Sequence, residues 1–125
     1  MIMIIKNKSD QKSFSSDVCG MLTEILNTSD FKNLSIVIAN NIKPSKGHFH
    51  KVSTEIYWVY KGKISLDTYD EDSQIRSTVN LDQESLIVIT PNIHHKVLFA
   101  SNNNKLIVIS NPRWTKEDEF ISKRV

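Results

Sequence analysis

The sequence predicts an all-β protein, a sandwich or barrel of short strands that follows a single short N-terminal helix. From residue 34 onward, β-branched and aromatic residues recur in short runs separated by polar turns, roughly eight to twelve residues apart. Several runs alternate apolar and polar residues, the pattern of strands with one buried face. Strands and helices do not alternate along the chain, and its three glycines form no phosphate-binding loop. This pattern therefore disfavours a nucleotide-binding α/β fold.

The N-terminal part predicts one strand and one helix. Residues 1–6 are rich in isoleucine and precede a polar run, which is typical of a short strand. The spacing of apolar residues predicts a helix over Asp17–Leu26, with Ser15 or Ser16 as its N-cap. We expect Cys19 to lie in the core beneath this helix, since nothing near it in sequence would make it a nucleophile.

The remaining elements are strands, followed by a polar tail. The strands are predicted, in chain order, over residues 34–39, 48–50, 56–60, 64–69, 75–81, 86–89, 97–99 and 105–110. Leu86–Ile89 is apolar throughout, so we expect both faces of that strand to be covered. The tail, 116–124, is expected to hold a short helical turn capped by Thr115.

Size and charge indicate one small globular domain. A chain of 125 residues fits a single domain over 1–125, with the barrel core at about 34–110. The net charge of +2 comes from 16 basic and 14 acidic residues that are interspersed along the chain. Such a balance lacks the dense basic stripe of nucleic-acid binders, so we expect no nucleic-acid partner.

Cysteine content and the N-terminus indicate the compartment. The chain has one cysteine, which excludes an internal disulfide and fits a reducing environment. The apolar opening stops at Lys6, which is too short for a secretory leader or a membrane span. We therefore expect a cytoplasmic protein with no membrane partner.

The four histidines gather in two clusters that have the spacing of metal ligands. His48 and His50 share one face of an extended segment, about 6.6 Å apart, and both can reach one ion at metal–nitrogen distances of about 2.1 Å. A turn of four residues then lets Glu55 return beside them on the next strand. The second cluster, His94 and His95, supplies a candidate fourth ligand.

This spacing resembles that of a known superfamily. His48-x-His50, four residues, Glu55, six residues and Gly62 is similar to the first cupin motif. That motif also has a glycine six residues before the first histidine, where this chain has Ile42.

The window 84–99 resembles the second cupin motif, with His95 at the position of its ligand histidine. This chain departs from that motif at Glu84 and Asn92, which replace glycines, at Thr90, which replaces proline, and at Phe99, which replaces asparagine. Asparagine is a tolerable substitute for glycine because it enters left-handed backbone conformations more readily than other residues.

The resemblance implies a double-stranded β-helix, the jelly-roll or cupin barrel, with a metal inside it. By position, the ligands would be His48, His50, Glu55 and His95. This ligand set suits divalent iron, manganese, nickel, copper or zinc and does not select among them. Strand alternation then turns Tyr57 and Val59 inward with Glu55, and Val97 and Phe99 inward with His95.

Residues near the motifs have further expected roles. Tyr57 is the candidate catalytic residue, as a proton donor or acceptor, although an inward tyrosine is also an ordinary core residue. His94 alternates out of phase with His95 and is expected at the surface or rim. Trp58 and Tyr60 share the opposite face of their strand, where they would pack between sheets or against a second subunit.

The resemblance implies several functions, and whether the protein is an enzyme stays open. Our first hypothesis is a small metal-dependent enzyme, with dioxygenase-like or other Lewis-acid chemistry, that acts on a small polar metabolite. Alternatives are a non-catalytic small-molecule-binding or regulatory cupin and a sugar-phosphate or nucleotide-sugar isomerase or epimerase. The isomerase would use Lys51, Lys96 and Arg76 at the barrel mouth to meet phosphate. We expect a homodimer, with the segment Ile2–Ile5 as a possible edge-pairing strand.

Overall fold

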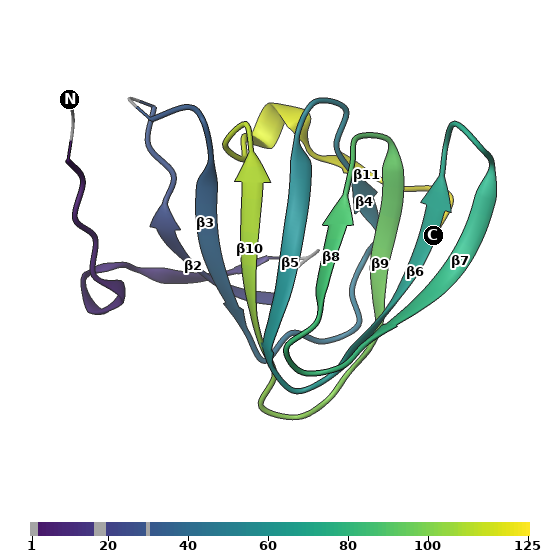
Figure 1. Cartoon of the computed structure of the whole chain (residues 1–125), viewed down its shortest axis with the longest axis horizontal. Helices are drawn as coiled ribbons and strands as arrows, with labels where there is room; N and C mark the ends of the chain where they lie inside the picture. Colours follow the sequence, from purple (N-terminus) through teal and green to yellow (C-terminus); the bar gives the residue numbers. More distant parts are fainter. Residues whose placement is uncertain (1–2, 17–19, 30) are drawn as a thin grey trace.

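The computed structural model describes residues 3–16, 20–29 and 31–125, which form two antiparallel sheets (Figure 1). The first sheet has the strand order β1 (Ser13–Ser16), β2 (Gly20–Leu26), β3 (Ser35–Asn40), β10 (Lys105–Asn111), β5 (Thr54–Lys61) and β8 (Leu86–Ile89). The second has the order β11 (Phe120–Ile121), β4 (His48–Phe49), β9 (Ile93–Ala100), β6 (Ile64–Asp70) and β7 (Ile75–Leu81). The all-β jelly-roll prediction is confirmed.

The core lies between the two sheets and follows the predicted alternation. In β5 and β10 every second side chain is buried, and these inward side chains meet Leu66 and Val97 of the other sheet. The buried apolar residues are Ala39, Ile42, Tyr57, Val59, Ile64, Leu66, Leu81, Ile89, Val97, Leu106 and Val108. Since β5 and β9 contribute to the core and also carry the candidate ligands Glu55 and His95, core packing holds these ligands in register.

The two predictions for the N-terminal part are wrong. Met21–Leu26 pairs with β3, so most of the expected helix over 17–26 is strand β2, and both candidate N-caps lie in β1. Strand pairing with a β-branched neighbour outweighs the modest helical preference of this segment. Residues 17–19, including Cys19, lie outside the described residues. Residues 3–6 form no strand, and residues 1–2 also lie outside.

The described helices are two short 3-10 turns, Lys8–Asp10 and Lys116–Asp118. The second confirms the turn expected after Thr115, although the Thr115 side chain makes no capping hydrogen bond. Within residues 3–16, 20–29 and 31–125, no helix is long and apolar enough to span a membrane.

One bulge changes the predicted inner face of β9. The pairing of β9 with β6 shifts so that Val97 faces Leu66 whereas Phe99 faces Ser65, which leaves Leu98 as the extra residue. The extra residue reverses the alternation, and Phe99 is 54% exposed instead of lining the barrel. Val97 points inward as predicted and is buried.

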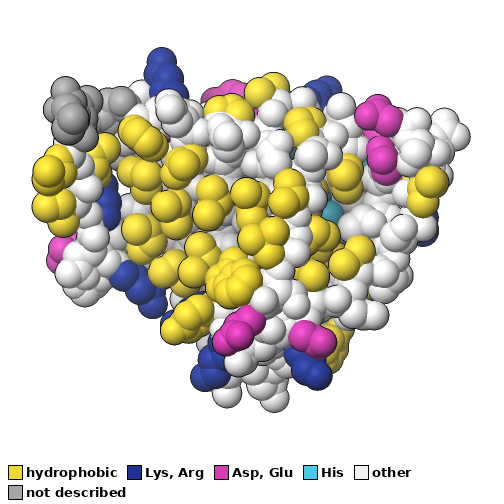
Figure 2. Space-filling view, viewed as in Figure 1, with side chains coloured by type: hydrophobic (Ala, Val, Ile, Leu, Met, Phe, Trp, Pro, Cys, Tyr) yellow, Lys and Arg dark blue, Asp and Glu magenta, His cyan; other side chains and the backbone are white. Residues whose placement is uncertain are grey.

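The outer face of the first sheet is apolar and uncovered in the single chain. Figure 2 shows hydrophobic side chains gathered over the strands of this sheet. The expectation that β8 is covered on both faces is wrong for one chain, because Leu86 and Val88 are 52% and 50% exposed. The inward residue Ile89 of the same strand is buried.

Candidate metal centre

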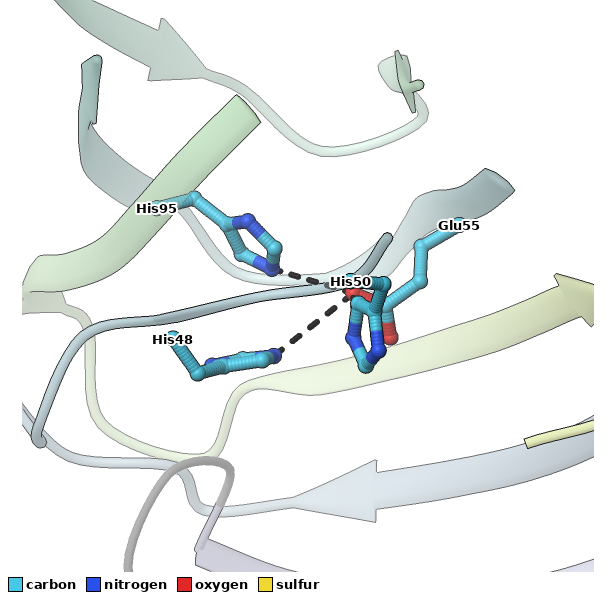
Figure 3. Close-up of side chains that lie close together, drawn as sticks. All are labelled: His48, His50, Glu55 and His95. Atoms are coloured by element: carbon cyan, nitrogen blue, oxygen red, sulfur yellow. Dashed lines mark hydrogen bonds and ion pairs between the residues drawn. The ribbon is translucent and has the colours of Figure 1, made fainter. Parts of the chain in front are cut away.

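Three histidines and one glutamate converge inside the barrel, as the two motifs predict (Figure 3). His48 on β4 lies opposite His95 on β9, and the chain then returns so that Glu55 on β5 faces both. The Glu55 Oε1 atom lies 2.9 Å from His50 Nε2, 3.0 Å from His95 Nε2 and 3.6 Å from His48 Nε2. One candidate ligand atom from each residue lies within 4.8 Å of all the others.

The donor set fits a divalent transition metal. All four side chains are buried, and their three imidazoles and one carboxylate are the donors that such ions prefer. Among the described residues, neither ring nitrogen of His48 has a hydrogen-bond partner. A buried polar nitrogen without a partner is costly, and a bound ion would satisfy one of the two.

Backbone carbonyls select which nitrogen of two histidines faces the centre. His50 Nδ1 donates to the Asp118 carbonyl at 2.7 Å, and His95 Nδ1 donates to the Ile93 carbonyl at 3.0 Å. A carbonyl can only accept, so the proton must lie on Nδ1 and Nε2 becomes the ligand atom of the neutral ring. This is the arrangement that orients histidines at metal sites.

The pKa values of the histidines around Glu55 are shifted in opposite directions. Burial, with help from the nearby His95, lowers the pKa of His48 to about 4. Burial would also lower the pKa of His50, but its hydrogen bond to Glu55 and the charge of that carboxylate outweigh burial and raise it to about 9. Burial opposes ionisation of Glu55, yet the three surrounding histidines hold its pKa well below the usual range. Without an ion, Glu55 and His50 therefore form a buried ion pair.

Asp118 supports the loop that carries these ligands, which the sequence did not predict. Its Oδ1 accepts hydrogen bonds from the backbone N–H groups of Lys51 and Val52 at 2.9 and 3.1 Å. Its Oδ2 accepts from the N–H of Ser53 at 2.9 Å. With the carbonyl contact to His50, this one residue holds the whole turn between His50 and Glu55 in place.

A cavity of about 270 Å³ opens from the candidate site to the surface. Its lining residues are Phe14, Ser15, Ser16, Leu22, Glu24, Glu55, Val37, Val108, Ser110, Trp114, Lys116 and Glu119. Glu55 is the candidate ligand that this cavity reaches, so a small molecule in it could touch a bound ion. Strand alternation did not predict these walls, because they come from β1, β2 and the C-terminal tail as well as the central strands.

Tyr57 points inward from β5, as predicted, and is buried. Its ring meets the His95 ring edge-on, with 5.8 Å between ring centroids. The structure therefore places the candidate catalytic residue beside a candidate ligand.

The prediction that His94 lies at the surface or rim is wrong. His94 does point to the opposite side from His95, but it is only 5% exposed. It stacks on Phe49 at 4.1 Å, contacts the Ser122 hydroxyl at 2.6 Å through Nδ1, and lies 3.0 Å from a Glu71 carboxylate oxygen through Nε2. The C-terminal tail covers it, and sequence spacing alone does not reveal such a cover.

The predicted basic cluster at the barrel mouth does not form. Lys51 lies over the Phe120 ring at 4.3 Å, and Arg76 pairs with Asp67 at 2.9 Å. Lys96 faces Asp67 across β6 and β9, out of phase with the inward His95. None of the three lines the cavity, whose described lining has one basic residue, Lys116.

Two antiparallel sheets around a buried cluster of three histidines and a glutamate define a cupin barrel with a candidate metal site. The family model of the polysaccharide biosynthesis C-terminal domain matches residues 15–119. The chain belongs to this family. No curated protein matches the chain at a significant level.

Solved structures share the fold at low sequence identity. A uridine complex of a variant of Streptomyces Pac13, a nucleoside dehydratase, is 15% identical with a TM-score of 0.76, over 98% of this chain and 92% of that one. Oxalate decarboxylase from Bacillus subtilis is 15% identical with a TM-score of 0.75, over 96% and 33%. Fe(II)-HppE is 12% identical with a TM-score of 0.68, over 87% and 60%. These likenesses establish the cupin fold.

Proposed function

We propose that this protein is a metal-dependent cupin enzyme that acts on a small molecule held in the cavity beside His48, His50, Glu55 and His95. The observation that carries the proposal is the convergence of these four buried donors within 4.8 Å of one another at the end of an open cavity. An iron, manganese, nickel, copper or zinc ion bound there would supply Lewis-acid chemistry, or oxygen activation if it is redox-active.

The protein groups have distinct tasks in this proposal. Glu55 and the three histidines hold the ion, and Glu55 acts as a ligand and not as a general base. Tyr57 would hold or move a proton at its hydroxyl, and the contact of its ring with His95 supports this role. The iron(II)-bound neighbour HppE and the two enzyme neighbours support the enzyme hypothesis, and a non-catalytic binding or regulatory cupin is the second candidate.

The sugar-phosphate isomerase hypothesis loses its structural basis. It needs several cations at the cavity, and the three basic residues that were expected there lie elsewhere. A nucleoside-like ligand, as in the Pac13 complex, needs no such cluster and stays compatible with the cavity.

Metal content tests the proposal directly. We expect the purified protein to bind about one divalent ion per chain, measured by elemental analysis, and His95→Ala to lose it. His94→Ala is the matched control. His94 is the buried histidine directly before His95, and its side chain faces away from the cluster. Equal metal content in both variants would exclude the site. Oxygen uptake and product assays on the loaded protein then separate enzyme from binding protein.

We also propose that the protein is a homodimer, formed in the cytoplasm through the outer face of the first sheet. This face carries Ile36, Ile38, Ile56, Trp58, Leu86, Val88, Ile107 and Ile109 (Figure 2). Monomeric proteins rarely leave so continuous an apolar surface to water, and a two-fold axis lets one such face bury another. A second copy would also cover β8 on both sides, as its sequence predicts.

Light scattering after size-exclusion chromatography tests the dimer. Val88→Asp should give monomers, because it places a charge within the buried face, on its edge strand β8. Ile75→Asp is the control, since Ile75 is an exposed isoleucine on β7 of the other sheet. A dimer that tolerates Val88→Asp, or a wild-type monomer, would refute this interface.

A further inference from the structure

The cavity beside the candidate metal site has mainly apolar and aromatic walls. Leu22, Val37 and Val108 line its interior, and Phe14 and Trp114 add two aromatic rings from opposite ends of the chain. Trp114 is fixed at both ends: its backbone N–H donates to Ser35 Oγ at 2.9 Å and its indole N–H donates to Glu119 Oε1 at 3.2 Å. A ring held in this way is a preorganised surface for another ring.

The polar groups of the cavity are also held by partners. Glu24 Oε2 accepts a hydrogen bond from the side-chain amide nitrogen of Asn27 at 2.6 Å. The side-chain oxygen of Asn27 in turn accepts one from the Arg113 guanidinium at 2.9 Å. Glu119 is held by the Trp114 indole. The two carboxylates are therefore held at the cavity wall instead of turning to solvent.

The charges of the described lining disfavour a strongly anionic ligand. Glu24 and Glu119 face the cavity along with the candidate ligand Glu55, and Lys116 is the one basic residue there. A phosphate group would meet two carboxylates and a single exposed lysine. A chelating group with at most one negative charge would be repelled less by these carboxylates.

We propose that this cavity binds a planar ring compound that chelates the metal through a pair of oxygen atoms and carries no phosphate, with Trp114 and Phe14 packing against the ring. The inference rests on the proposed metal site and names the class of substrate that the site takes. It replaces the small polar metabolite of the sequence hypothesis by a ligand with an apolar body.

Two hydroxamates test the ring requirement, because they share the chelating group and differ by a phenyl ring. Calorimetry on the zinc-loaded full chain should give at least about tenfold tighter binding for benzohydroxamate than for acetohydroxamate, as ring stacking is usually this strong. Glucose 6-phosphate should not bind. Zinc is measured after each titration to show that the ion stays on the protein.

Substitutions of the two aromatic residues test whether they cause the preference for benzohydroxamate. Trp114→Ala and, separately, the exposed Phe14→Ala should each reduce the preference for the phenyl ring severalfold and leave the acetohydroxamate affinity within about twofold. Phe99→Ala, an exposed aromatic residue on β9, is the control and should keep the preference. Phe14→Ala keeps the test valid if Trp114→Ala does not fold.

The possible failures are distinguishable. A protein that takes up no zinc overturns the proposed metal site and this inference with it. A zinc-loaded protein that binds both hydroxamates equally, binds glucose 6-phosphate more tightly, or keeps its full preference in both variants overturns the substrate class alone.

Discussion

Removing the Asp118 carboxylate should destabilise the ligand loop between His50 and Glu55. In Asp118→Ala, the N–H groups of Lys51, Val52 and Ser53 lose a charged acceptor, and such hydrogen bonds contribute about 1.5–3 kcal/mol each in protected sites. Lys51 and Val52 are exposed, so water replaces most of their loss, whereas Ser53 is buried. We therefore expect a total loss of about 2–3 kcal/mol in the free energy of unfolding.

Urea denaturation of the metal-free protein measures this loss, with Glu117→Ala as the control from the same turn. Zinc affinity, measured by competition with a chelator, should fall roughly tenfold or more because the loop orients His50. Asp118→Asn should recover only part of the stability, since its amide N–H₂ group would face a backbone N–H. If Asp118→Ala matches Glu117→Ala in both measurements, the loop does not depend on this carboxylate.

The remaining predictions concern pH and backbone conformation. In the metal-free protein the raised pKa of His50 stabilises the fold fully below about pH 6.5, and this contribution is lost as pH rises to about 9. The lowered pKa values of His48 and Glu55 act in the opposite direction. Stability therefore also falls as pH drops, below about 6.5 for His48 and below about 4.5 for Glu55, and thermal unfolding across pH should show a maximum near neutrality. Zinc loading at pH 7 should release a proton from His50, which calorimetry in buffers of different ionisation enthalpy would detect. Gly62→Ala should cost about 1–3 kcal/mol, because φ is +87° and the new Cβ would lie 2.5 Å from Ser101 Oγ. Glu84→Gly should instead raise stability by up to about 1 kcal/mol, since Glu84 has a φ of +66° that glycine adopts without strain. Equal melting temperatures for Gly62→Ala and Glu84→Gly would contradict both predictions.

Sequence spacing predicted the central strands because these depend on local alternation, and the resemblance to the two cupin motifs implied all four members of the buried cluster. His48, Glu55 and His95 lie on strands whose inward faces follow from every second residue, whereas the meeting of these separate strands was implied by the two motifs. The departures from the second cupin motif also have a backbone explanation. Glu84 and Asn92, which stand where the motif has glycines, both adopt the left-handed conformation that the motif requires.

The errors arise where a distant segment or a single extra residue decides the outcome. Met21–Leu26 has helical spacing, but the available edge of β3 makes it a strand. Phe99 is turned outward by one bulge, which no periodicity reveals. The burial of His94 depends on Ser122, 28 residues further along the chain.

The C-terminal tail explains why the fold could be predicted better than the site. Trp114 and Glu119 form a wall of the cavity, Asp118 holds the ligand loop, and Ser122 anchors the tail on the outside of the second sheet. These contacts are all between residues far apart in sequence, and in isolation the tail resembles an ordinary polar end. A cupin barrel needs only its strands to fold, whereas the geometry of this metal centre and the shape of its cavity depend on where the tail crosses them. Differences among related chains in substrate and metal affinity should therefore concentrate in residues 114–122 more than in the four ligands.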